Sequence, residues 1–134
     1  MLNRINELLD KECTFAFETT LAAKSYKSKI IEAKAKGYKV KLLFFWLQNV
    51  NLACERVKTR VLEGGHNIPT ETIKRRYTRG IKNLFEIYLP IVDDVMIFDN
   101  SFGLNEIIAE KHFDGELSII NLEKFNLLNT KKNE

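Results

Sequence analysis

The spacing of apolar residues along the chain predicts helices that alternate with short strands. Residues three or four positions apart share a helix face, and apolar residues recur at this spacing in four segments. These segments are residues 2–11, about 20–36, about 49–63 and 69–89. Gly37 stands where a left-handed cap would end the second helix, and Gly64 and Gly65 stop the third, whose start Asn49 or Asn51 would cap. Pro90 marks the end of the fourth helix.

Short apolar runs between these helices predict strands. The runs are TFAFE at 14–18, YKVKLLFFWL at 38–47 and VMIFD at 95–99. The run at 38–47 is nearly continuous rather than alternating, which is typical of a central strand in a covered parallel sheet. Residues 107–112 and 117–121 flank Phe113-Asp114-Gly115-Glu116, where Asp-Gly suits a type I′ turn and predicts a C-terminal β-hairpin. The last five residues, TKKNE, are expected to fray.

Strands separated by helices of these lengths predict β-α-β units, and therefore an α/β domain with a parallel sheet and flanking helices. In such sheets ligands bind beyond the carboxyl ends of the strands. Three such ends are polar here: Glu18-Thr19-Thr20, Gln48-Asn49 and Asp99-Asn100-Ser101.

Length and composition predict one domain over residues 1–134. The chain is 45% apolar and 29% charged, and its net charge is +3. Residues 51–90 hold eight Lys or Arg against four Glu, so this segment alone carries +4. Cys13 and Cys54 fit two reduced thiols in a cytoplasmic protein. The charged first residues exclude a signal peptide, and the longest apolar run, 42–47, is too short to cross a membrane.

The segment from Arg56 to Arg79 holds the strongest candidate binding residues. Guanidinium groups bind phosphate oxygens in a planar, multidentate way, so arginines around a Gly-Gly turn suggest a lid over a phosphorylated ligand. The candidates are Arg60, His66, Arg75, Arg76 and Arg79. Arg75 and Arg79 share a helix face, whereas Arg76 points about 100° away, so the whole set cannot reach one ligand. The alternative is a solvated basic helix whose arginines pair with Glu71.

Glu18 follows an apolar run directly, which places a carboxylate at the mouth of a predicted strand. It could accept hydrogen bonds from a substrate hydroxyl or help order a magnesium shell, or it could only contact the next helix N-terminus. With His66 and His112 alone and no paired cysteines, no metal site is expected. None of the six glycines is followed by lysine, so the chain contains no GxxxxGK[ST] phosphate-binding loop.

Four stretches in sequence order closely resemble the zeta-toxin-like branch of the P-loop kinases. They are FETTLA, YKVKLLFFWL, ERVKTRVLEGGHNIPTETIKRRY and VMIFDNS, and the resemblance covers roughly Leu2 to Asp114. It implies a three-layer α/β fold and nucleotide-dependent phosphotransfer with ATP or GTP and Mg. The best-known zeta toxins phosphorylate UDP-N-acetylglucosamine and are held inactive by a small helical antitoxin.

The resemblance also implies roles for individual residues. Glu18 with Thr19 would contact the substrate, and Arg60 with one of Arg75 or Arg76 would contact the terminal phosphates. His66 would belong to the lid. Asp99, Asn100 and Ser101 would lie toward the nucleotide base. The chain resembles the C-terminal two-thirds of such a kinase, so the P-loop and the catalytic aspartate are missing together. We therefore expect no tight nucleotide binding and no appreciable kinase activity by the chain alone.

Two other functions and one structural consequence stay open from the sequence. The chain could be a non-catalytic binding or regulatory module, or a nucleic-acid binder using residues 56–82, although only Tyr77 supplies an aromatic ring there. In P-loop kinases the P-loop strand lies between the strands predicted at 14–18 and 38–47. Without it, these two strands either pair directly or leave unpaired edges for another chain. We expect a homo-oligomer, with an antitoxin-like protein as a further partner and no membrane association.

Overall fold

The structure, a computed structural model, describes residues 2–113 and 115–132. Its helices are α1 (Leu2–Asp10), α2 (Tyr26–Ala35), α3 (Val50–Leu62), α4 (Thr70–Asn83), the π-helical turn η1 (Leu84–Tyr88) and α5 (Leu122–Lys131). Its strands are β1 (Lys41–Trp46), β2 (Asp94–Asp99), β3 (Glu106–Lys111) and β4 (Ser118–Ile119). The predicted mixture of helices and strands is confirmed.

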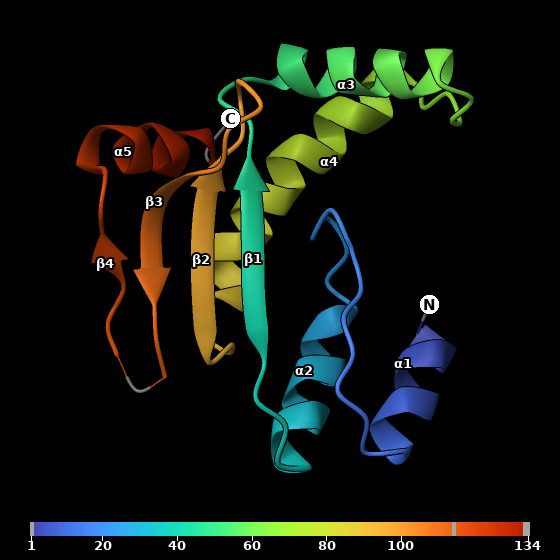
Figure 1. Cartoon of the computed structure of the whole chain (residues 1–134), viewed down its shortest axis with the longest axis vertical. Helices are drawn as coiled ribbons and strands as arrows, with labels where there is room; N and C mark the ends of the chain where they lie inside the picture. The colour runs from blue at the N-terminus through green and yellow to red at the C-terminus, as the bar shows by residue number, and fades with distance from the viewer. Residues whose placement is uncertain (1, 114, 133–134) are drawn as a thin grey trace.

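The four strands form one mixed sheet in the order β1-β2-β3-β4 (Figure 1). β1 and β2 are parallel, with Lys41 opposite Asp94 and Trp46 opposite Asp99. β3 is antiparallel to both β2 and β4. The predicted parallel sheet is therefore wrong beyond its first pair, because β2 and β3 are joined by a short connection that reverses the chain. The predicted C-terminal hairpin forms, although its turn includes Asp114, which lies outside the described residues.

β1 lies at an edge of this sheet, so the prediction of a central strand is wrong. Leu42, Phe44 and Trp46 point toward the core, whereas Leu43 is 47% exposed and Phe45 is 51% exposed on the other face. Phe45 stacks on Phe98 with ring centroids 5.1 Å apart. A continuous apolar run predicts two covered faces, but only one is covered here.

The predicted strand at 14–18 is also wrong. No backbone hydrogen bond joins this segment to another strand in the described part of the chain, so its direct pairing with β1 does not occur. Phe15 instead packs edge-on against Tyr38, and Phe17 packs against Tyr26. A cavity of about 210 Å³ lies between residues 15–17 and residues 39–42. The apolar run is extended but has no ladder partner.

The main core lies on one face of the sheet, where α4, η1 and α5 pack. Its members are buried apolar residues from these elements, from the three longer strands and from the loops at Leu21 and Val92: Leu21, Trp46, Ile81, Leu84, Tyr88, Val92, Val95, Ile97, Ile108, Ala109 and Leu128. In Figure 1 no described helix lies over the near face of the strands. The third layer implied by the resemblance is therefore not present among the described residues.

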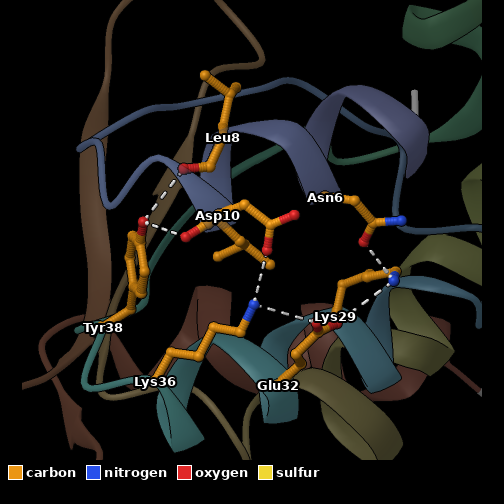
Figure 2. A network of polar contacts seen from close by, with 8 residues as sticks. Asn6, Leu8, Asp10, Lys29, Glu32, Lys36 and Tyr38 are labelled. Carbon is orange, nitrogen blue, oxygen red and sulfur yellow. Dashed lines mark hydrogen bonds and ion pairs between the residues drawn. The ribbon is translucent and has the colours of Figure 1, made fainter.

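α1 docks on α2 through a second, smaller core of Ile5, Leu9 and Ala33. Figure 2 shows the polar contacts around it. Lys29 Nζ donates to Asn6 Oδ1 at 2.5 Å, and the Tyr38 hydroxyl lies 3.3 Å from the carbonyl oxygens at the end of α1. These contacts fix α1 at the edge of the molecule beside the extended segment that follows it.

Local signals for helix ends agree well with the structure. Asn49 caps α3 by accepting a hydrogen bond from Leu52 N at 3.0 Å, and Gly37 has the left-handed φ of 90° expected after α2. α2 begins at Tyr26 rather than near residue 20, because residues 19–23 form a tight loop. α5 was not predicted, and the part of the expected frayed tail at Thr130 and Lys131 belongs to it. Residues 133–134 lie outside the described residues.

Candidate functional site

Asp99 lies at the carboxyl end of β2 and organises a buried polar network. Its Oδ1 accepts hydrogen bonds from Ser101 N at 2.9 Å and from Ser101 Oγ at 2.5 Å. Its Oδ2 accepts from Gln48 Nε2 at 2.8 Å and forms an ion pair with Lys124 Nζ at 2.9 Å. Gln48 N also donates to Ser101 Oγ, so the ends of β1 and β2 are tied together. Lys124 reaches Glu106 as well.

The environment of Asp99 keeps its carboxylate ionised. Burial by itself would raise the pKa of Asp99, but hydrogen bonds from Ser101, Gln48 and Lys124 outweigh that effect and hold the pKa at about 2. The pKa of Lys124 is raised, chiefly by its hydrogen bond to Glu106 and next by its hydrogen bond to Asp99. Both oxygens of Asp99 are occupied, so this carboxylate fits a structural anchor better than a free base.

Asn100 links this strand end to α3 and to the next loop. Arg56 Nη1 donates to Asn100 Oδ1 at 2.5 Å, and its other terminal nitrogen donates to the Asn100 carbonyl. Asn100 Nδ2 in turn donates to Asn105 Oδ1. The loop between Asn100 and Asn105 exposes two apolar side chains, Phe102 (79% exposed) and Leu104 (80% exposed). An apolar surface therefore lies directly beside the polar network.

The helical hairpin α3–α4 projects from the edge where β1 ends (Figure 1). Gly64, with φ 95°, ends α3, and its N–H donates to Val61 O while Gly65 N donates to Arg60 O. At the other end of the hairpin, the Tyr77 hydroxyl donates to Leu47 O at 2.6 Å. The turn and this tether hold the two helices side by side.

The five candidate phosphate-binding residues lie on this hairpin. Arg60 is in the last turn of α3, His66 follows the Gly-Gly turn, and Arg75, Arg76 and Arg79 are on α4. All five side chains are exposed, and none of these side chains has a hydrogen bond or ion pair with another described residue. The alternative of arginines paired with Glu71 is therefore not seen among the described contacts. Arg60 comes ten residues after Val50, which puts it about 15 Å along α3.

Glu18 and Thr19 lie in the connection between α1 and α2. Both are exposed, and Thr19 Oγ1 accepts a hydrogen bond from Leu21 N at 3.2 Å. The structure thus presents three separate groups: the cationic hairpin, the Glu18–Thr19 loop and the Asp99 network. Arg56 ties α3 to Asn100, and Asn83 ties α4 to the loop at Leu21. The five candidate side chains of the hairpin make no hydrogen bond or ion pair with the other two groups within the described residues.

Sequence reasoning missed Arg56, Gln48 and Lys124 as members of the polar network. Lys124 follows the α5 cap Asn121, and the apolar spacing of Leu122, Phe125 and Leu128 could have revealed that helix. Within residues 2–113 and 115–132, no three His, Cys, Asp or Glu side chains are placed to hold a metal ion. None of the described helices is both long enough and apolar enough to cross a bilayer.

Comparisons with known proteins place this geometry in context. A family model described as zeta toxin matches residues 3–110. An uncharacterized protein of Haemophilus influenzae (strain ATCC 51907 / DSM 11121 / KW20 / Rd) is 35% identical over 63 residues, which are 47% of this chain and 45% of that protein. The match therefore spans less than half of that relative. No solved structure matches the chain.

Proposed function

The chain belongs to the zeta toxin family, and on that premise we propose that it is a nucleotide-dependent phosphotransferase domain whose α3–α4 hairpin binds the phosphates of ATP or GTP. One observation carries the proposal: the side chains of Arg60, His66, Arg75, Arg76 and Arg79 are exposed and have no acidic partner among the described residues. Unpaired guanidinium groups are available to bind phosphate oxygens, whereas paired ones are not.

We propose that Glu18 and Thr19 serve a nucleotide-sugar substrate and that Asp99, Asn100 and Ser101 border the nucleotide base. The exposed Phe102 beside the Asp99 network supports the second assignment, because an aromatic side chain can pack against a base. Asp99 itself would act by holding the loop, since its oxygens are already occupied.

The proposed domain does not carry out transfer by itself. Phosphoryl transfer depends on a cradle for the phosphates and on metal ions that neutralise the developing charge. The chain has no GxxxxGK[ST] sequence, and within the described residues no three His, Cys, Asp or Glu side chains are placed to hold a metal ion. We therefore expect its own residues to bind and orient a nucleotide only weakly. Transfer would need a phosphate cradle and metal ligands that the described part of this chain does not supply.

An ATP titration monitored by amide NMR of the ¹⁵N-labelled 134-residue protein tests phosphate binding by the hairpin. Incubating the same sample with ATP and UDP-N-acetylglucosamine tests its inactivity. We expect shifts at residues 60–66 and 75–79 at millimolar ATP, and at least fivefold weaker binding in the double variant Arg75→Gln/Arg79→Gln. Lys58→Gln, an exposed change on α3, is the matched control. Shifts that avoid the hairpin would contradict the binding proposal. Phosphorylation of UDP-N-acetylglucosamine by the same sample would contradict the inactivity.

A non-catalytic binding module is the second candidate, and the missing phosphate-binding loop favours it. ATP binding on the hairpin that persists without any transfer, even when a P-loop-containing relative is added, would support it. Nucleic-acid binding is less well supported, because the Tyr77 hydroxyl is engaged with Leu47 O and the hairpin has no other aromatic residue among its basic ones. The antitoxin-like partner stays a prediction.

A further inference from the structure

The loop that carries Glu18 and Thr19 is held from beneath by the same helix that carries the arginines. Asn83 is 3% exposed, and its Nδ2 donates to Leu21 O at 2.8 Å and to Ala22 O at 3.1 Å. Tyr88 is fully buried, and its hydroxyl donates to Ala23 O at 2.5 Å. Three successive carbonyl groups of the loop are therefore bound by two side chains of α4 and η1.

Gly80 brings the helix and the loop unusually close. A Cβ atom built on Gly80 would lie 2.4 Å from Thr20 O, a distance that real Cβ contacts do not reach. Gly80 and Asn83 are three positions apart, so they share a face of α4. Any larger residue at position 80 would push the loop away from Asn83.

The π-helical turn explains how Asn83 and Tyr88 act together. Residues five positions apart in an α-helix point about 140° from each other. A turn that closes from one residue to the fifth beyond it brings such a pair to the same side of the helix. Leu89 N donates to Leu84 O at 2.8 Å, a hydrogen bond between residues five positions apart instead of the four of an α-helix. Across this wider turn both Asn83 and Tyr88 bind the loop.

The loop itself has a conformation that needs such support. Leu21 is 5% exposed and has φ 62°, in the left-handed region that side chains other than glycine rarely adopt. Thr19 Oγ1 and Thr20 Oγ1 accept hydrogen bonds from the amides of Leu21 and Ala22, two residues ahead of each. A left-handed leucine between two such turns persists only where its surroundings fix it.

We infer that Gly80, Asn83 and Tyr88 are positioning residues, which fix the Glu18–Ala23 loop so that it presents Glu18 and Thr19 to the substrate. α4 and η1 would then link the two halves of the site, with the exposed Arg75 and Arg79 on α4 and the buried clamp residues in the last turn of α4 and in η1. The inference rests on the proposed function for its substrate, but the clamp can be measured independently.

Hydrogen exchange tests the clamp without any ligand. In Gly80→Ala and in Tyr88→Phe, we expect the amides of Leu21 and Ala22 to exchange at least tenfold faster, with β2 and β3 unchanged. Tyr77→Phe is the matched control, because it removes a hydroxyl of the same helix, one that donates to Leu47 O. Unchanged exchange at Leu21 and Ala22, or an equal increase in β2 and β3, would overturn the clamp.

Ligand titrations separate positioning from general stability. With UDP-N-acetylglucosamine as the probe, we expect amide shifts at residues 18–20 in the wild type and at least fivefold weaker binding in Gly80→Ala. ATP shifts at residues 75–79 should stay within twofold. A loss of both responses, or of neither, would overturn the positioning role, as would a wild type without shifts at 18–20. If ATP alone gives no shifts on the hairpin, the proposed function fails while the exchange result still decides the clamp.

Discussion

At the residue scale, Asp99 shows how a buried charge is held at the end of a strand. Four hydrogen bonds or ion-pair contacts surround a carboxylate that is 3% exposed. Removing such a group leaves Ser101 and Gln48 without their acceptor, and Lys124 keeps Glu106 alone as a counter-charge. Asp99 therefore contributes stability that depends on its ionisation.

This dependence gives a pH prediction. The folded pKa of Asp99, about 2, lies below its ordinary value of 3.8, so the unfolded state takes up a proton first as the pH falls. The stabilisation is complete above about pH 4 and is lost toward pH 2. Between pH 6 and pH 3 we expect the wild type to lose about 1 kcal/mol more unfolding free energy than Asp99→Asn. Urea unfolding at several pH values measures this difference.

Asp10→Asn is the control for that measurement, because Asp10 pairs with Lys36 at an exposed site. Its loss of stability with pH should follow the wild type closely. Parallel curves for the wild type and Asp99→Asn would mean that Asp99 is not held ionised by this network.

At the element scale, the α3–α4 hairpin depends on its two adjacent glycines in different ways. Gly64 has φ 95° with nothing near its Cβ position, so Gly64→Ala should cost about 1 kcal/mol through the backbone alone. A Cβ on Gly65 would lie 2.7 Å from Arg60 O, so Gly65→Ala must open the turn and should cost more, about 2 kcal/mol. Urea unfolding measures both. Equal costs would show that the close approach at Gly65 relaxes freely.

The elements also show which features the sequence could predict. The ends of α3 follow from Asn49 and Gly64, because capping depends on residues only a few positions away. TFAFE, at 14–18, has the apolar composition of a strand. A strand also needs a neighbouring strand to hydrogen-bond with, and residues 14–18 alone do not specify one. The Asp99–Lys124 pair joins residues 25 positions apart through a helix that sequence reasoning missed. The five candidate phosphate-binding residues of the α3–α4 hairpin could be named from the sequence. That their side chains have no partner among the described residues could not be predicted.

At the scale of the whole molecule, one edge and one face of the sheet are incomplete. β1 pairs only with β2 among the described residues. No described helix covers the face that carries Leu43 and Phe45 (Figure 1), and residues 42–46 contain no charged side chain, although Lys41 begins the strand on the same face. Apolar edge strands of this kind are templates for pairing with another chain. The cavity beside residues 39–42 leaves additional space at the same edge.

We therefore expect self-association through β1, measured by light scattering over a range of concentrations. The wild type should approach twice the monomer mass as its concentration rises, because association buries Leu43 and Phe45 and pairs the free backbone groups of the edge. Phe45→Lys should return it to the monomer mass, since a lysine on this face would be buried without a counter-charge. Leu62→Lys is the control, because Leu62 is 88% exposed on α3, away from the sheet. A wild type that stays monomeric at high concentration, or a Leu62→Lys variant that dissociates as Phe45→Lys does, would place the association elsewhere or exclude it.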